Sequence, residues 1–190
     1  DDVRFVTMSP DGKRLLSSGL YKSKLMMDDP ENGEFMDALN GHIGWIKNAI
    51  FTMDKAKVVS VGSDKTLRVW NAISKDCLRI LKGHTGEISS AGITHDGKRV
   101  VSGSWDKTLR IWNLESGECL NLLEGHTDHV SCVNITPDGR KAISGSNDKF
   151  IRIWDIENGK CLLTLEHKDI VRNMSLTPDG KIAVLTGGDL

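Results

Sequence analysis

A repeat of 42 residues constrains this chain of 190 residues more than any other feature. Gly-His occurs at residues 41–42, 83–84 and 125–126, and a tryptophan followed by Asn or Asp occurs at 70–71, 112–113 and 154–155. An Asp-Lys pair precedes each of these tryptophans at the same distance. Segments 83–124 and 125–166 align without gaps, and about half of their positions are identical. Such a period predicts a row of equivalent structural units.

The segment 125–166 contains four short stretches that alternate as β-strands do. These stretches are HVSCVNI, KAISGS, FIRIWDI and CLLTL, and residues typical of tight turns separate them. One turn, Pro137-Asp138-Gly139-Arg140, has a glycine that can adopt the positive φ such turns require. No window of ten residues keeps a helical period. Four antiparallel strands in about 42 residues form one blade of a β-propeller.

The Gly-His pair, the Asp before the third strand and the Trp-Asn or Trp-Asp at its end resemble the WD-repeat β-propeller family. The resemblance covers nearly the whole chain and implies an all-β fold of about four and a half four-stranded blades. In the first repeat Met27-Asp28 stands where the others have Trp-Asn or Trp-Asp. We expect a degenerate blade at 1–40, full blades at 41–82, 83–124 and 125–166, and a partial blade at 167–190.

Each full repeat also contains His, Ser and Asp, residue types that can build a nucleophilic site. Catalysis needs such a triad once, whereas this set occurs three times at identical spacing, so we interpret it as structural. The resemblance implies that each set, with the repeated tryptophan, forms a buried hydrogen-bonded network. Its members can satisfy one another's donors and acceptors. The predicted network residues are His42, Ser60, Asp64, Trp70, His84, Ser102, Asp106, Trp112, His126, Ser144, Asp148 and Trp154.

The composition excludes several classes of function. The net charge is −1 and no basic stripe is present, which argues against nucleic acid or an anionic membrane as a partner. No apolar stretch approaches the roughly 20 residues of a membrane span. The sequence has no nucleotide-binding loop, metal-ligand cluster or unique acid–base pair. We therefore predict no enzymatic activity, no catalytic residue, no metal site and no cofactor.

The four cysteines give no sign of a metal site or a disulfide framework. Cys77, Cys119 and Cys161 are one period apart, Cys132 stands alone, and none belongs to a CxxC pair. A spacing of one whole repeat would hold the first three too far apart for a disulfide. We interpret all four as small buried hydrophobic residues, which suits a reducing, cytoplasmic location.

The number of blades raises the question of how the ring closes. Members of the family usually close with seven blades, so four and a half are expected to form an open arc. Both ends of such an arc would expose apolar faces and unpaired strand edges. We favour a fragment of a longer protein. The alternatives are a complete chain that closes a ring by self-association and an independent small propeller.

Function is expected where the repeats differ, because the shared positions serve the fold. In the family, the rim that carries the Gly-His loop and the Asp loop is the usual docking face. Trp45 and Trp105 break the repeat on this rim and could anchor a partner or pack over their own blades. Lys47 and Glu87 could instead be ordinary surface charges, and His129 a solvated loop residue. The predicted partner-binding residues are Trp45, Lys47, Glu87, Trp105, His129, Asn147 and Arg172.

Two functions fit these features. The first is a protein-interaction scaffold that binds a peptide or protein partner on the propeller rim. The second is a sensor or regulatory repeat domain of a larger signalling protein, such as a nucleotide-switch ATPase or a kinase. A phosphate-binding loop or kinase signature elsewhere in the gene would favour the second.

Overall fold

The computed structural model describes residues 3–19 and 22–188. The extreme ends of the first and fifth predicted blades, residues 1–2 and 189–190, lie outside the described part, as do residues 20–21. All regular structure in the described ranges is β-strand. These ranges therefore contain no helix that is long and apolar enough to cross a membrane.

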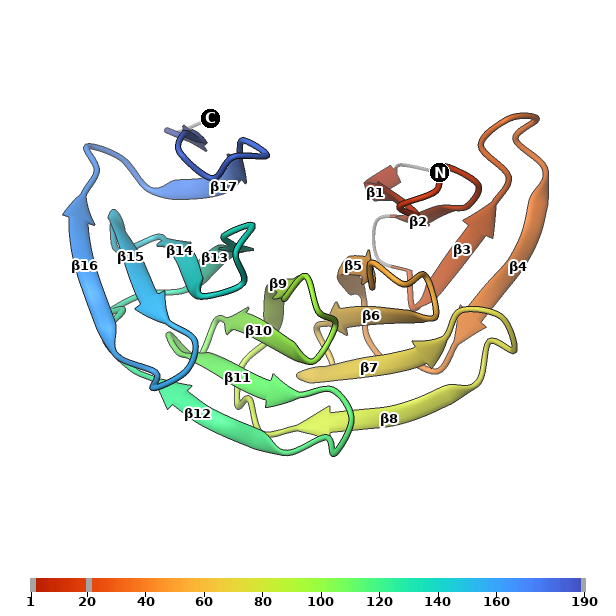
Figure 1. Ribbon diagram of the computed structural model, residues 1–190, viewed down its shortest axis with the longest axis horizontal. Coiled ribbons are helices and arrows are strands. Elements are labelled where there is room, and N and C mark those ends of the chain that lie inside the picture. Colours follow the sequence, from red (N-terminus) through yellow and green to blue (C-terminus); the bar gives the residue numbers. More distant parts are fainter. Residues whose placement is uncertain (1–2, 20–21, 189–190) are drawn as a thin grey trace.

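The strands form four antiparallel sheets of four strands and a fifth sheet of two (Figure 1). Each strand pairs with its neighbours in the sequence, as short turns between strands require. The predicted all-β, partial propeller fold is confirmed. The strands are β1 (Val3–Met8), β2 (Leu15–Gly19), β3 (Lys24–Asp28), β4 (Phe35–Asn40), β5 (Ile46–Phe51), β6 (Lys57–Gly62), β7 (Thr66–Asn71), β8 (Cys77–Lys82), β9 (Ile88–Ile93), β10 (Arg99–Ser104), β11 (Leu109–Asn113), β12 (Cys119–Leu123), β13 (Val130–Ile135), β14 (Lys141–Ser146), β15 (Phe150–Asp155), β16 (Cys161–Glu166), β17 (Val171–Leu176) and β18 (Ala183–Gly187).

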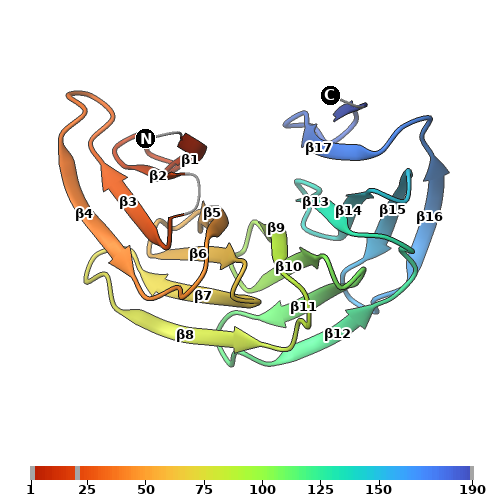
Figure 2. The same ribbon diagram turned by 180° about the vertical axis from the view of Figure 1, so that it is seen from behind.

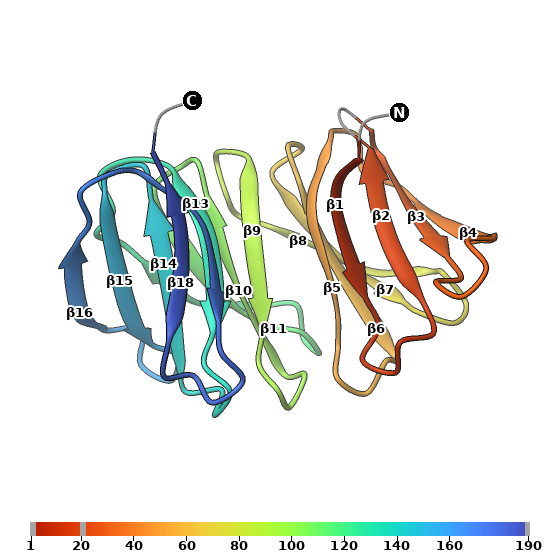
Figure 3. The same cartoon turned by 90° about the horizontal axis from the view of Figure 1, so that it is seen from above.

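The sheets stand side by side as blades of an arc that is open between β1 and β17 (Figures 1 and 2). The inner strands are β1, β5, β9, β13 and β17, and the outer strands are β4, β8, β12 and β16. Figure 3 shows the blades edge-on, with the β1–β2 turn at the lower rim and the start of β1 and the end of β18 at the upper rim. The loops between strands therefore gather on two opposite rims.

Apolar side chains of adjacent blades pack into one core between each pair of blades. The core between the second and third blades includes Val61, Leu81, Val100 and Trp112. In the first blade the buried side chain of Met27 takes the place of the repeated tryptophan. Because each core draws residues from two blades, every blade stabilises its neighbours.

The two ends of the arc expose apolar side chains, as predicted. Leu165 on β16 is 45% exposed, whereas its equivalents Leu81 and Leu123 are 2% and 1% exposed beneath the following blade. At the other end, Val3 and Val6 on β1 are exposed. These faces lack the neighbouring blade that covers the same positions elsewhere.

The interpretation of all four cysteines as buried residues is wrong for three of them. Cys77, Cys119 and Cys161 are exposed, and only Cys132 is buried. Each exposed cysteine begins an outer strand, where a single residue of β8 or β12 and none of β16 is buried. Alternation along an outer strand therefore does not predict burial.

The exposed and buried thiols are expected to react at different rates. Burial raises the pKa of the Cys132 thiol to about 11, which suppresses the reactive thiolate. In the native protein, Ellman's reagent should modify three thiols rapidly and the fourth only after a denaturant is added. Four rapid thiols, or fewer than three, would contradict the placement of the cysteines.

Candidate functional site

The repeated polar residues of the third blade form one chain of hydrogen bonds. The indole N–H of Trp112 donates to Ser102 Oγ at 2.9 Å. The Ser102 hydroxyl donates to His84 Nε2 at 2.8 Å, and His84 Nδ1–H donates to Asp106 Oδ2 at 2.8 Å. Each donor in this chain thus has an acceptor.

The same chain occurs in the second and fourth blades. In the second blade, His42 is 2.8 Å from Asp64 and 2.7 Å from Ser60, and Trp70 Nε1 is 2.8 Å from Ser60. In the fourth blade, His126, Ser144, Asp148 and Trp154 have equivalent contacts. The structure therefore brings each predicted set together within its own blade. The three serines, Ser60, Ser102 and Ser144, are 0% exposed.

The electrostatics favour a charged aspartate in each network and a neutral histidine in that of the fourth blade. Burial raises the pKa of Asp64 and Asp106, but hydrogen bonds from the histidine and neighbouring groups outweigh it and hold each pKa well below its ordinary value. Burial lowers the pKa of His126 despite the contact with Asp148. A neutral imidazole can donate at Nδ1 and accept at Nε2, as the network requires.

Local backbone geometry explains the other repeated residues. Lys107 has a φ of 73°, so the Asp-Lys pair turns the chain and brings the Asp106 carboxylate towards the backbone N–H of Thr85 at 2.9 Å. A Cβ atom at Gly83 would lie 3.1 Å from both Arg110 Nη1 and Trp112 Cη2. The close approach of these strand-three side chains thus favours the glycine of Gly-His.

Five of the predicted partner-binding residues form a contiguous group, here called the rim cluster: Trp45, Lys47, Glu87, Trp105 and His129. The rings of Trp105 and His129 are parallel, with centres 4.9 Å apart. Lys47 Nζ lies 4.4 Å from the centre of Trp105 and 5.9 Å from that of Trp45. It also forms an ion pair with Glu87 at 2.7 Å. The rim cluster joins the second, third and fourth blades.

These contacts bear on the alternative interpretations of two rim residues. Lys47 is not an ordinary surface charge, because its side chain is only 6% exposed and is paired with Glu87. His129 lies in the loop before β13 and stays partly exposed, but one face of its ring stacks on Trp105. Both contacts cross from one blade to the next, so they depend on the angle between blades rather than on the period.

A pocket of about 270 Å³ lies beside the rim cluster and receives the other two predicted residues. Asn147 and Arg172 line it together with Lys47, Trp105 and His129. The backbone N–H of Asn147 donates to the carbonyl of His129 at 3.0 Å. All seven predicted residues therefore lie in the rim cluster or in this rim pocket.

Arg4 also lines the rim pocket, although it is not among the predicted partner-binding residues. A signal was present: VRFVTMSPDGK at 3–13 and VRNMSLTPDGK at 171–181 are four whole periods of 42 residues apart. Arg4 is therefore the repeat equivalent of Arg172. It also corresponds to Lys47, which lies 43 residues later, because the strand register of β1 skips Arg4 and that of β5 skips Lys47. The degeneration of the first repeat around residues 20–28 hid this register.

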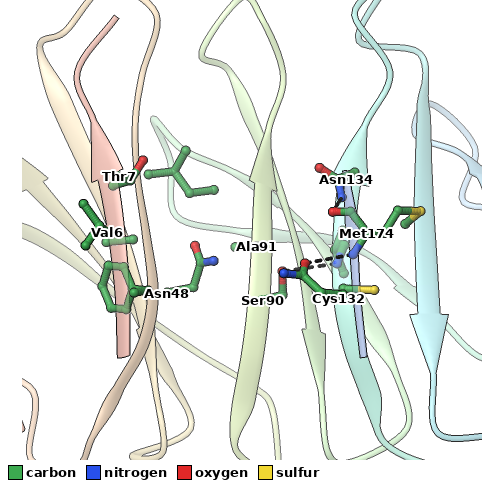
Figure 4. Close-up of a pocket in the computed structure, with 13 residues that line it drawn as sticks. Val6, Thr7, Asn48, Ser90, Ala91, Cys132, Asn134 and Met174 are labelled. Carbon is green, nitrogen blue, oxygen red and sulfur yellow. Dashed lines mark hydrogen bonds between the residues drawn. The ribbon is translucent and has the colours of Figure 1, made fainter. Parts of the chain in front are cut away.

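A second pocket of about 250 Å³ lies deeper, between the inner strands. Figure 4 shows Asn48, Ser90, Cys132 and Asn134 among the residues that line it, on β5, β9 and β13. Asn134 donates to the carbonyl of Met174 at 2.7 Å, which ties the fourth blade to the fifth. No group of three His, Cys, Asp or Glu side chains within residues 3–19 and 22–188 could hold a metal ion.

Curated relatives share sequence with part of this chain. WD repeat and SOCS box-containing protein 1 of Homo sapiens is 34% identical over 70 residues, which are 36% of this chain and 17% of that protein. The proteins of that name from Mus musculus and Danio rerio are 33% identical over 70 residues and 32% identical over 72. The chain thus matches about a sixth of the length of these relatives.

A family model covers much more of the chain. The model described as "WD domain, G-beta repeat" matches residues 33–71, 75–113, 117–155 and 159–189. The first three matches end at the last residue of the third strand of a blade, namely of β7, β11 and β15. Because these matches cover well over half of its residues, the chain belongs to the WD-repeat family.

Proposed function

We propose that this chain is a protein-interaction platform that binds a peptide or protein partner at the rim cluster and the rim pocket. WD repeats generally mediate protein–protein interaction. The relatives contain a SOCS box as well as WD repeats, as their name states, so their repeats accompany another module. A binding role for the repeats of the present chain agrees with both.

The observation that carries the proposal is the combination of contact and exposure at Trp105. Its ring is held by His129 and Lys47 from the neighbouring blades, yet the residue is 41% exposed. An aromatic side chain fixed before binding loses little conformational entropy when a partner covers it. Exposed tryptophans of this kind supply much of the energy of protein interfaces.

Catalysis is a weaker candidate for the repeated Ser, His and Asp. The three serines are fully buried, and their hydrogen bonds to tryptophan and histidine are already made. A nucleophile must reach its substrate. We therefore propose a non-enzymatic, cofactor-free protein. A cytoplasmic location is likewise a proposal, supported by four free cysteines.

Replacing Trp105 by alanine is expected to weaken partner binding at least about tenfold, because it removes a rigid aromatic anchor. The measurement is affinity purification from source cells with quantitative mass spectrometry, followed by calorimetric titration of each captured protein. The fold should persist, because Trp105 lies outside the inter-blade cores.

His95→Ala is the matched control for this experiment. His95 is an exposed ring in the β9–β10 turn of the same blade, on the opposite rim. The control should retain every partner that wild type binds. Equal recovery of all partners by wild type and Trp105→Ala would contradict the proposed function.

A further inference from the structure

A β-bulge recurs at one position of all five inner strands. The strand register skips Arg4 between Val3 and Phe5, and it skips Arg172 between Val171 and Asn173. The equivalent residues Lys47, Ser89 and Ser131 are skipped in the same way. A bulge redirects a side chain out of the regular alternation of the strand. All five residues line the rim pocket.

The two serines at the bulges hold the blades together. Ser89 Oγ donates to the carbonyls of Gly103 at 3.0 Å and of Val130. Ser131 Oγ makes the corresponding bonds to Gly145, at 3.0 Å, and to Val171. The bulge residue is thus a hydrogen-bonded serine in the third and fourth blades. It is a basic residue in the first, second and fifth blades.

The three basic residues at the bulges differ in whether an ion pair neutralises their charge. The Lys47 ammonium is paired with Glu87. Arg4 and Arg172 are both exposed, and neither forms an ion pair with any residue that the structure describes. Arg172 Nε donates to the carbonyl of Gly188 at 3.2 Å, which fixes that side chain. Two guanidinium groups therefore face the same pocket without a described counter-charge.

The space below the rim pocket is also lined by basic and neutral residues. A neighbouring pocket of about 460 Å³ shares Arg4, Lys47 and Arg172 with it and continues inwards to Asn48 and Asn173. Among the described residues, no Asp or Glu lines the rim pocket, this pocket or the deeper one. The chain as a whole has a net charge of −1, so the positive lining is local. Concave sites with one sign of charge concentrate ligands of the opposite sign.

We infer that the rim pocket selects an acidic peptide segment, whose carboxylates pair with Arg4 and Arg172 while an adjacent apolar side chain packs on Trp105. This inference rests on the proposed function and specifies the chemistry of the partner. Arginine presents a planar fork that matches a carboxylate. A peptide fits better than a nucleic acid, because the chain has no net positive charge and the pocket offers only a few positive groups.

The test is a selection from a random peptide phage library on the immobilised protein. Wild type should enrich peptides with several Asp or Glu residues next to an apolar residue. The charge-removing variant Arg4→Gln/Arg172→Gln should lose this acidic enrichment. In fluorescence anisotropy it should bind the best wild-type peptide about five- to tenfold more weakly.

Lys13→Gln/Lys181→Gln is the matched control, because it removes the same charge from the same two repeats in the turns of the opposite rim. It should behave as wild type. Wild-type affinity should also fall as salt rises from about 50 mM to about 500 mM, and replacing each Glu or Asp of the peptide by Gln or Asn should weaken binding. These two results use only the wild-type protein and do not depend on folding of the variants.

The inference is overturned if no peptide is enriched, if the enriched peptides are neutral or basic, or if Arg4→Gln/Arg172→Gln keeps the acidic enrichment. It is also overturned if inorganic phosphate or a single-stranded oligonucleotide displaces the peptide at equal charge concentration, since the pocket would then bind anions or nucleic acid in general. Trp105→Ala separates the two proposals. Loss of captured proteins by that variant, without acidic selection by wild type, would leave the proposed function standing alone.

Discussion

Trp112→Ala is expected to lower the free energy of unfolding by about 3–5 kcal/mol. The side chain is 1% exposed and packs in the core shared by the second and third blades. Truncation leaves a cavity at that boundary and removes the indole N–H that donates to Ser102 at 2.9 Å. Both losses act on the same pair of blades. Urea denaturation followed by circular dichroism measures the change.

Trp105→Ala provides the comparison from the same blade. This tryptophan is partly exposed and contributes a stacked ring and a cation–π contact rather than core packing. Its removal should therefore cost only about 1 kcal/mol of stability. Losses of similar size in the two variants would show that the repeated and the unrepeated tryptophan do not divide into a structural and a binding residue.

The period predicted the architecture because every blade forms the same four strands from the same pattern of apolar and turn residues. Strand alternation, turn residues and the spacing of 42 residues each recur, so an ambiguous stretch in one repeat is resolved by its equivalents. The Ser–His–Asp–Trp sets could be assigned to the fold for the same reason. A residue set that appears once offers no such comparison.

The sequence could predict which residues lie on the rim, but it could not predict which of their side chains contact one another. Lys47, Trp105 and His129 come from three blades, and their contacts depend on the angle between blades and on the rotamer of each side chain. Ordinary alternation does not predict that a bulge redirects Arg4 and Arg172 towards one pocket. The cysteines show the converse limit, because Cys77 and its equivalents fall on outer strands that are exposed on most positions of both faces.

Asp106→Ala is expected to lower the free energy of unfolding by about 2–4 kcal/mol, because it leaves the N–H of the buried His84 ring without an acceptor and removes two further hydrogen bonds. Asp106 accepts from His84 Nδ1–H at 2.8 Å, from the backbone N–H of Thr85 at 2.9 Å and from the Thr108 hydroxyl at 2.6 Å. The matched control is Asp96→Ala. Asp96 accepts similar bonds in an exposed turn of the opposite rim, where water can replace them, so its loss should cost under about 1 kcal/mol.

The dependence of these losses on pH tests whether the Asp106 charge is responsible. In the folded protein burial raises the pKa of Asp106, but the bonds from His84 and Thr108 outweigh burial and hold that pKa below its ordinary value of 3.8. The carboxylate therefore contributes its full stability above pH 3.8, and this contribution is lost as the pH falls towards the folded pKa. The difference in free energy of unfolding between wild type and Asp106→Ala should narrow steadily from about pH 4 to about pH 2. A difference that stays constant over this range would mean that Asp106 stabilises the blade by filling space, and that its hydrogen bonds as a charged acceptor contribute little.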